Sequence, residues 1–402
     1  MASIKKRTWV SGGKEKSAWV VYYQDQQKRQ HIKTFRTKHE AEAWRTETMH
    51  EIARGIHTPP ATSITIAEAG RKWIEQCEAD GLERATVRQY RQHLDLHIAP
   101  LIGSLKLAEL SIASVKDFRN TLLKNGRPAT ELEERQAGAK RMPVSRGMAG
   151  KVVVSLGALI GNAMESGLVA RSVVREQARG HSTRQRRIEK RHDKQLEVGI
   201  DIPTKDELRA ILVAAQGMEL RWRAFLHTLV FTGLRASEMR GLRWSDVSFE
   251  KGAITVRRRA DRFNEIGAPK SDSGKREIPI PAEVVQMLRE WRMAGPRWPL
   301  DLVFPNSQGG VASLLNLTHS GLGVVQKKAG ISTERLRPKY GMHAFRHAAA
   351  SLFIDQKMTP KEVQVLMGHS TIGVTFDTYG HLFKAKDEGR LAAERIAAEL
   401  LG

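Results

Sequence analysis

The stretch Thr232-Gly233-Leu234-Arg235-Ala236-Ser237-Glu238 lies between two predicted helices in the C-terminal half of this 402-residue chain. The hydrophobic run before it predicts a helix, and Gly233 can adopt the left-handed conformation that ends such a helix. Ser237 and Glu238 can begin the next helix. Because Arg235 and Glu238 are three residues apart, they also have the spacing of a helical ion pair. The stretch therefore predicts an arginine held at a junction between helices.

Four further pieces follow in the sequence, and each carries a group that can hold or move charge. They are Lys270, His343-Ala344-Phe345-Arg346, Gly368-His369-Ser370 and Tyr379. The spacing of His343 and Arg346 predicts one shared helix face, with His347 facing elsewhere. Gly368 is expected to end a helix, which would place His369 at a junction where its side chain can point into a cleft.

Together these pieces supply two guanidinium groups, an ammonium group, two imidazoles and a phenol. Phosphoryl transfer depends mainly on positioning and on stabilising charge on the non-bridging oxygens, and fixed arginine side chains can do this where other enzymes use Mg²⁺. A tyrosine can serve as the nucleophile. The set therefore predicts transfer of a phosphodiester with no metal ion and no cofactor.

The order and local sequence of the pieces resemble the tyrosine recombinases of the phage integrase family, from Thr204 to about Leu382. The resemblance implies that Arg235 and Arg346 clamp the scissile phosphate and that Tyr379 attacks it. It assigns these catalytic residues: Arg235, Glu238, Lys270, His343, Arg346, His369 and Tyr379.

The remaining members of that set have supporting roles by the same resemblance. Glu238 matches an acidic position that supports the active site. His343 would transfer a proton or form a hydrogen bond, and His369 would donate a hydrogen bond to the phosphate. In this family a hairpin lysine protonates the leaving 5′ oxygen, which a lysine can do if phosphate proximity and desolvation adjust its pKa. Lys270 has the familiar spacing, and Lys275 is the competing candidate.

The composition predicts a polyanionic partner, with double-stranded DNA as the leading candidate. The chain has 66 Lys and Arg against 44 Asp and Glu, a formal net charge of +22. Its first residues lack the apolar segment of a signal peptide, and no uncharged apolar run reaches about 18 residues. We therefore expect a cytoplasmic, DNA-associated protein in a bacterial host, without membrane contact. The single cysteine, Cys77, excludes an internal disulfide and a multi-cysteine zinc site.

Residues 1–57 predict a small unit of strands followed by a helix. Residues 18–23 and 29–35 are rich in β-branched and aromatic side chains, and Thr37 with Glu40 has the spacing of a capping box. The unit resembles the arm-site-binding domain of some integrases, whose sheet would lie in a DNA groove. The alternative is a sheet with a solvated basic face. The predicted DNA contacts here are Lys28, Arg29 and Lys33.

Residues 64–175 predict an all-α unit after a proline-containing linker. A second capping box begins at Thr65, and apolar spacing predicts helices over residues 85–96, 115–123 and 151–166. The unit resembles the core-binding domain of the family. Residues 124–146 are interpreted as an exposed insertion.

Residues 176–200 are predicted to link this unit to the last one. Basic residues are numerous in this segment and apolar residues are scarce, which is typical of a solvated segment. Contacts with DNA phosphates would favour such a basic linker. The predicted DNA contacts in the linker are Arg184, Arg186, Arg187, Lys190 and Arg191.

Residues 201–402 predict an α-rich (α+β) catalytic domain, which makes the whole a mostly α, multidomain chain. A third capping box begins at Thr204, and a hairpin is expected around residues 254–256 and 277–280. The apolar stripe of residues 391–401 predicts a C-terminal helix that docks on a neighbouring copy or on its own domain.

The sequence thus predicts a site-specific recombinase that integrates or excises a phage or other mobile element through a 3′-phosphotyrosyl intermediate. The covalent intermediate keeps the bond energy, so neither ATP nor metal is required. The resemblance implies a homotetramer on DNA, with an accessory DNA-bending or excision-directing protein as a candidate partner. Two alternatives stay open. A type IB topoisomerase uses the same chemistry but reseals the same strand, and a DNA-binding regulator would have an inactive site.

Overall fold

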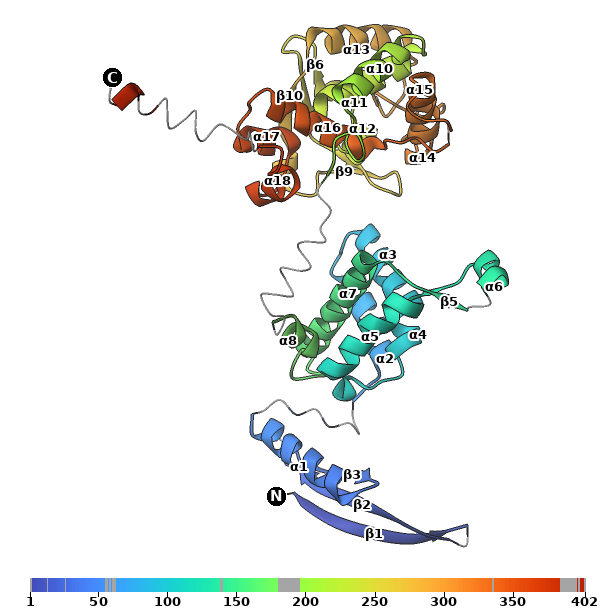
Figure 1. Cartoon of the computed structure of the whole chain (residues 1–402), viewed down its shortest axis with the longest axis vertical. Coiled ribbons are helices and arrows are strands. Elements are labelled where there is room, and N and C mark those ends of the chain that lie inside the picture. Colours follow the sequence, from blue (N-terminus) through green and yellow to red (C-terminus); the bar gives the residue numbers. More distant parts are fainter. Residues whose placement is uncertain are drawn as a thin grey trace. The chain divides into compact units, whose positions relative to one another are not determined.

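The computed structural model divides the chain into two compact units, Met1–Arg191 and His192–Gly402 (Figure 1). It describes residues 2–12, 14–25, 27–54, 57, 59, 63–137, 140–179, 196–334, 336–383, 396 and 398–400. The predicted DNA contacts Arg184, Arg186, Arg187, Lys190 and Arg191 lie outside the described residues, as does most of the predicted C-terminal helix.

The first unit begins with an antiparallel sheet of order β1-β2-β3, followed by α1. The capping box predicted at Thr37 is confirmed. Strand β1 was not predicted, because its residues are mostly exposed and lack the alternation of apolar and polar residues that reveals a half-buried strand. The elements are β1 (Ser3–Ser11), β2 (Lys14–Gln24), β3 (Gln30–Phe35) and α1 (Lys38–Ala53).

The predicted DNA contacts in this sheet lie in two different settings. Lys28 and Arg29 are exposed in the turn between β2 and β3, where Lys28 has a φ of 62°. Lys33 lies on β3 with its ammonium group 4.9 Å from the centre of the Trp44 ring of α1. Lys33 therefore packs toward α1, whereas the turn residues point to solvent.

The helices that follow pack around α7, whose buried face includes Val152, Leu156 and Leu159. The predicted helix at residues 85–96 continues further, because the π-helical turn η1 joins α3 to α4. The elements are α2 (Ile66–Ala79), α3 (Arg84–His93), η1 (Leu94–Ile98), α4 (Ala99–Ile102), η2 (Leu107–Glu109), α5 (Ile112–Asn125), α7 (Arg146–Glu165) and α8 (Val173–Arg179). By length and composition α7 could cross a membrane, but in this fold its apolar face forms the centre of the bundle.

The segment interpreted as an exposed insertion has its own structure. Strands β4 (Arg127–Pro128) and β5 (Arg141–Met142) pair, with α6 (Glu131–Ala137) between them. Arg141 donates hydrogen bonds to the carbonyl oxygens of Leu96, Asn125 and Gly126, which anchor the segment to the bundle.

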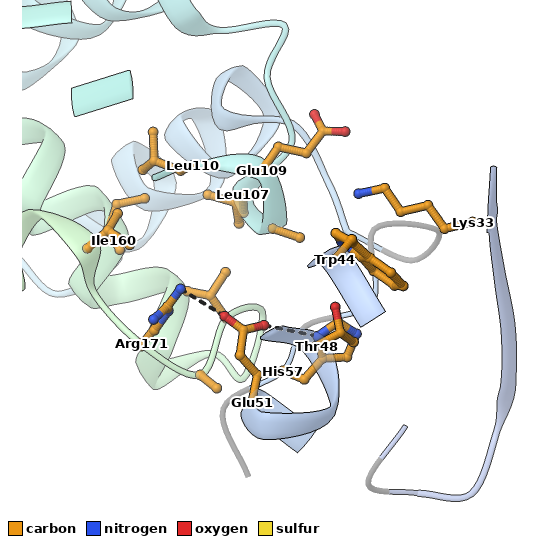
Figure 2. Close-up of a pocket in the computed structure, with 14 residues that line it drawn as sticks. Lys33, Trp44, Thr48, Glu51, His57, Leu107, Glu109, Leu110, Ile160 and Arg171 are labelled. Carbon is orange, nitrogen blue, oxygen red and sulfur yellow. Dashed lines mark hydrogen bonds and ion pairs between the residues drawn. The ribbon is translucent and has the colours of Figure 1, made fainter. Parts of the chain in front are cut away.

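A pocket in the first unit is lined by residues of α1 and of the helical bundle (Figure 2). Glu51 of α1 pairs with Arg171 at 2.9 Å and with His57 at 3.3 Å. His57 Nε2 lies 3.2 Å from the hydroxyl of Tyr23. Glu51 therefore connects the sheet and helix at the start of the chain with the segment between α7 and α8.

The second unit has a helical core beside a small sheet of order β10-β7-β6. Helices α11 and α16 pack together through buried residues such as Phe225, Leu229 and Phe345. The capping box predicted at Thr204 is confirmed. The helices are α10 (Lys205–Gln216), α11 (Leu220–Thr232), α12 (Ala236–Gly241), η3 (Trp244–Asp246), η4 (Asp272–Gly274), α13 (Ala282–Ala294), α14 (Leu314–Asn316), η5 (Leu317–Leu322), α15 (Gly323–Lys328), α16 (Met342–Asp355), α17 (Pro360–Met367) and α18 (Ile372–Tyr379).

The predicted hairpin forms between β7 and β10, whose pairing opposes Val256 to Arg276 and Ile254 to Ile278. Figure 1 shows β10 beside α17, and Arg276 donates a 2.6 Å hydrogen bond to the carbonyl oxygen of Leu366 in that helix. The strands are β6 (Val247–Ser248), β7 (Ala253–Val256), β8 (Arg259–Ala260), β9 (Ile266–Gly267) and β10 (Arg276–Pro279).

The bundle around α7 leads to a test of its core. Leu156 is 0% exposed, so the Leu156→Ala variant is expected to lower the free energy of unfolding by about 2–5 kcal/mol, through lost burial and a cavity. Val154 of the same helix is 71% exposed, and Val154→Ala should change it by less than about 0.5 kcal/mol. Urea denaturation followed by circular dichroism measures both, and equal stability of the two variants would contradict the packing of α7.

Candidate active site

Tyr379, the predicted nucleophile, lies at the end of α18 and is 1% exposed. Its hydroxyl lies 2.7 Å from Nδ1 of His347 on α16. Burial raises the pKa of Tyr379 to about 12, although the charges of Arg346 and Arg235 act in the opposite direction. The side chain is therefore a neutral phenol that is hydrogen-bonded to His347.

The prediction that His347 faces away from the site is wrong. Each helical residue turns by about 100°, so four residues bring His347 to within about 40° of His343. The two imidazole ring centres lie 4.4 Å apart. Burial, together with the nearby charges of His343 and Arg346, lowers the pKa of His347 to about 4. The i, i+4 spacing in His-Ala-Phe-Arg-His was the signal that could have identified it.

Arg346 lies one turn from His343 on α16 and is 3% exposed. Nη1 donates a 2.8 Å hydrogen bond to the carbonyl oxygen of Gly233, and Nη2 donates to the carbonyl oxygen of Met367. Burial and the charge of Arg235 lower the pKa of Arg346 to about 9, so the guanidinium remains charged at neutral pH. Two helix ends thus hold this arginine in place.

Arg235 precedes α12, and its side chain is 37% exposed. It donates from Nη1 to Glu238 at 2.7 Å and from Nη2 to the carbonyl oxygen of Gly368 at 2.7 Å. The ion pair expected from the i, i+3 spacing is therefore present. The partial exposure leaves this guanidinium accessible from solvent.

Glu238 is 3% exposed, and its main partner is Arg276 of β10. The two side chains form a bidentate pair, with distances of 3.1 Å from Nη1 to Oε1 and 2.9 Å from Nη2 to Oε2. Burial would raise the pKa of Glu238, but the hydrogen bonds and charge of Arg276, with the charge of Arg235, lower it to about 2. Glu238 is therefore ionised between two arginines.

Arg276 was not selected in the sequence, although a signal for it existed. In β10 the buried positions are 276 and 278, so Arg276 occupies the face that Ile278 buries. An arginine on the apolar face of a strand needs a buried partner, because burial of an unpaired charge is costly.

Two glycines make the arginine contacts possible. Gly233 and Gly368 end α11 and α17 in the left-handed conformation, with φ values of 59° and 63°, as the sequence predicted. A Cβ atom on Gly233 would lie 2.8 Å from Cβ of Ala349, and one on Gly368 would lie 2.8 Å from Nη1 of Arg276. The caps therefore require glycine both for their backbone conformation and for space.

The two predicted histidines have different surroundings. His369 is buried, its Nδ1 lies 2.9 Å from Oγ1 of Thr375, and its ring stacks on that of Tyr379 at a centre distance of 6.1 Å. Burial and the charges of Arg346 and Arg235 lower its pKa to about 4. His343 is exposed next to His347.

Both candidate lysines lie on the exposed loop between β9 and β10. Lys275 lies next to Arg276, and its Nζ is 3.7 Å from a carboxylate oxygen of Asp272. Lys270 lies earlier in the loop, before the turn η4. The loop leads directly into β10, which begins with Arg276 of the site. Both lysines therefore remain candidates for the general acid.

The structure thus brings together six of the seven predicted catalytic side chains, along with two that the sequence analysis did not select, His347 and Arg276. They come from the start of α12, from β10, from α16 and from the chain between α17 and the end of α18. The six are Arg235, Glu238, His343, Arg346, His369 and Tyr379.

The Glu238–Arg276 pair leads to a stability prediction with a defined pH dependence. Arg276→Met leaves a buried carboxylate without its main partner and should cost about 3–5 kcal/mol of unfolding free energy at pH 7. The stability from the lowered pKa is present above the ordinary value of 4.5 and is lost as the pH falls toward about 2. The difference in unfolding free energy between Arg276→Met and the wild type should therefore become smaller as the pH falls from 4.5 toward about 2.

Denaturant unfolding at several pH values measures this difference, and Arg257→Met, which changes an exposed arginine of the same unit, is the matched control. A cost of Arg276→Met that stays constant from pH 7 to pH 2 would contradict the ionised, paired state of Glu238.

Comparisons with known proteins agree on one family. The Phage integrase family matches residues 203–386, and the Phage integrase, N-terminal SAM-like domain matches residues 65–123. A "Tyrosine recombinase XerC-like" protein of Caldanaerobacter subterraneus subsp. tengcongensis is 24% identical over 408 residues, covering 94% of this chain and 95% of that protein. Together the two family matches cover more than half of the chain.

Solved structures share the fold. The Tn1549 transposon integrase in complex with a circular intermediate DNA has a TM-score of 0.61 and 21% identity, covering 83% of this chain and 100% of that one. A lambda integrase tetramer bound to a Holliday junction has a TM-score of 0.51 and 16% identity, covering 90% of this chain and 95% of that one. The chain therefore belongs to the phage integrase family of tyrosine recombinases.

Proposed function

We propose that this chain is a site-specific DNA recombinase that integrates or excises a phage or other mobile element. One observation carries the proposal: the hydroxyl of Tyr379 lies in a site whose two arginines, Arg235 and Arg346, are fixed by the ends of α11 and α17. The arrangement pairs a nucleophile with preorganised positive charge, which phosphodiester transfer requires.

In the proposed reaction, Oη of Tyr379 attacks the scissile phosphorus, and the bond from phosphorus to the 5′ oxygen breaks. The products are a 3′-phosphotyrosyl bond and a free 5′ hydroxyl. The 5′ hydroxyl of a partner strand then attacks the phosphotyrosine, which restores the tyrosine and joins the strands. Because one phosphodiester replaces another through a covalent intermediate, the reaction needs no ATP.

The two arginines would divide the work of holding the phosphate. Arg346 is buried and bound to two carbonyl oxygens, whereas Arg235 is partly exposed. Arg235 is thus the group that an incoming DNA backbone would meet first. Their positions are set before DNA binds, so little reorganisation is needed as charge develops on the non-bridging oxygens.

The charge and the relatives support double-stranded DNA as the partner. A formal net charge of +22 favours phosphate contacts. The exposed turn residues Lys28 and Arg29 and the basic linker are proposed to contact the backbone, and Lys33 is proposed to do so from its position over Trp44. By analogy with the lambda integrase tetramer on a Holliday junction, we propose a homotetramer on DNA.

The setting of the reaction is part of the same proposal. We place the protein in the cytoplasm of a bacterial host, where an accessory DNA-bending or excision-directing protein would choose the direction of recombination. Strand exchange between two DNA molecules, rather than relaxation of one supercoiled molecule, would distinguish this activity from that of a topoisomerase.

The first functional prediction concerns the covalent intermediate. The wild-type protein, incubated in a chelator with fragments from the region flanking its own gene, is expected to form a covalent protein–DNA adduct. Tyr379→Phe removes the nucleophilic oxygen and should form none, while Tyr340→Phe, which changes a buried tyrosine of the same unit, should retain it. Denaturing electrophoresis of labelled DNA measures the adduct.

Two outcomes would oppose this prediction. An adduct that survives Tyr379→Phe would move the nucleophile to another residue. Tight DNA binding without an adduct on any flanking fragment would support a regulator with an inactive site.

The second functional prediction separates Lys270 from Lys275. One of the two lysines is expected to protonate the leaving 5′ oxygen. Changing that lysine to Ala should lower the cleavage rate by about 10²-fold or more, and changing the other should lower it little. A 5′-bridging phosphorothiolate in the same fragment has a sulfur leaving group that needs no proton, so it should restore the slow variant. Single-turnover cleavage measures both rates, and wild-type rates for both variants on the natural phosphodiester would exclude both lysines as the acid.

A further inference from the structure

The hydroxyl of Tyr379 is bound by a histidine that the catalytic assignments leave out. His347 Nδ1 lies 2.7 Å from Oη, and the two ring centres lie 5.6 Å apart. The histidines assigned from the sequence have other settings: His369 binds Thr375 through Nδ1, and His343 packs against the ring of His347. The hydrogen bond of the nucleophile itself is therefore with His347.

The charge state of His347 suits it to accept a proton. Burial, with His343 and Arg346 nearby, lowers its pKa to about 4, so the imidazole is neutral at pH 7. A neutral imidazole has one donor nitrogen and one acceptor nitrogen. In the tautomer that carries its proton on Nε2, Nδ1 is the acceptor nitrogen and lies within hydrogen-bond distance of the neutral phenol of Tyr379.

We propose that His347 is a further catalytic residue, which accepts the proton of Tyr379 as the tyrosine attacks DNA and returns it when the strands are rejoined. This inference rests on the proposed recombinase function. In the forward step the Oη–P bond forms, the proton moves from Oη to Nδ1, and the P–O5′ bond breaks. The 5′ oxygen takes its proton from the lysine acid. In the reverse step the attacking 5′ hydroxyl gives its proton to the neutral lysine as the P–O5′ bond forms, the Oη–P bond breaks, and the imidazolium gives its proton back to Oη.

The charges around His347 define when this transfer becomes favourable. The groups that influence it are His343 and Arg346 on α16, Tyr379 on α18, His369 before α18, and Asp201 before α10. At rest, the arginine charge opposes an imidazolium. A bound phosphate brings negative charge between Arg235 and Arg346, and the phenol becomes more acidic as Oη bonds to phosphorus, so both changes favour transfer to Nδ1.

The rival role for His347 is to hold Tyr379 in position without taking its proton, and two variants separate the roles. In His347→Asn the amide can accept a hydrogen bond near the position of Nδ1 but cannot take a proton. In His347→Ala both properties are lost. His227→Asn, which changes a buried histidine bound to a carbonyl of its own helix α11, is the matched control.

Full-length variants are compared in single-turnover adduct formation on the flanking fragment that the wild type cleaves. Both His347 variants should be slower by about 10² to 10⁴-fold, because general-base catalysis contributes that much. The defect should persist on the 5′-bridging phosphorothiolate, which restores only loss of the lysine acid. Raising the pH should partly rescue both variants by deprotonating the phenol directly. A rate of His347→Asn close to wild type would overturn the base role.

A second measurement needs no DNA and tests the hydrogen bond that the inference starts from. In the free protein at pH 7, the ¹⁵N shifts of His347 should show a neutral ring with the proton on Nε2, and Tyr379→Phe should shift the Nδ1 signal. A doubly protonated ring, or a signal unaffected by Tyr379→Phe, would overturn the inference.

The outcomes also separate this inference from the proposed function. No adduct from wild type on any fragment would refute the proposed function and the base role with it. An adduct that depends on Tyr379 but forms at full rate in both His347 variants would refute the base role and leave the recombinase function intact.

Discussion

The active site depends on one carboxylate, that of Glu238. Three guanidinium groups, those of Arg235, Arg276 and Arg346, lie close enough for their charges to affect one another. Glu238 binds two of them directly, and carbonyl oxygens at the ends of α11 and α17 bind the third. Without this carboxylate and these carbonyl dipoles, repulsion between like charges would separate the arginines. The same carboxylate therefore joins α12 to β10 and keeps the positive charge of the site concentrated.

The side chains of the site also differ in their exposure to solvent. Arg235 and His343 are accessible to solvent, whereas Arg346, His369 and Tyr379 are buried. A DNA backbone would thus meet one arginine and one histidine at the surface before it reached the nucleophile. Since Tyr379 is a neutral phenol hydrogen-bonded to a neutral histidine, the free site holds the predicted nucleophile in its less reactive, protonated form.

Much of the fold could be predicted from local signals in the sequence. The errors concern residues whose partners are distant in the sequence. Glycine caps and capping boxes depend on neighbours in the chain, so Gly233, Gly368 and Thr204 were predicted correctly. Strand β1 has no apolar alternation, and its pairing with β2 shows only in three dimensions. His347 and Arg276 each had a local signal, but the partners that define their roles, Tyr379 and Glu238, lie 32 and 38 residues away.

Gly368 has several structural roles, although it has no side chain. It ends α17, gives its carbonyl oxygen to Arg235 and leaves space for Arg276. A descendant that kept every catalytic side chain but replaced this glycine would look intact when its reactive residues were compared, yet its site would be distorted. A comparison of reactive side chains alone is therefore not enough to judge whether a related chain keeps this site, because position 368 has to be compared as well.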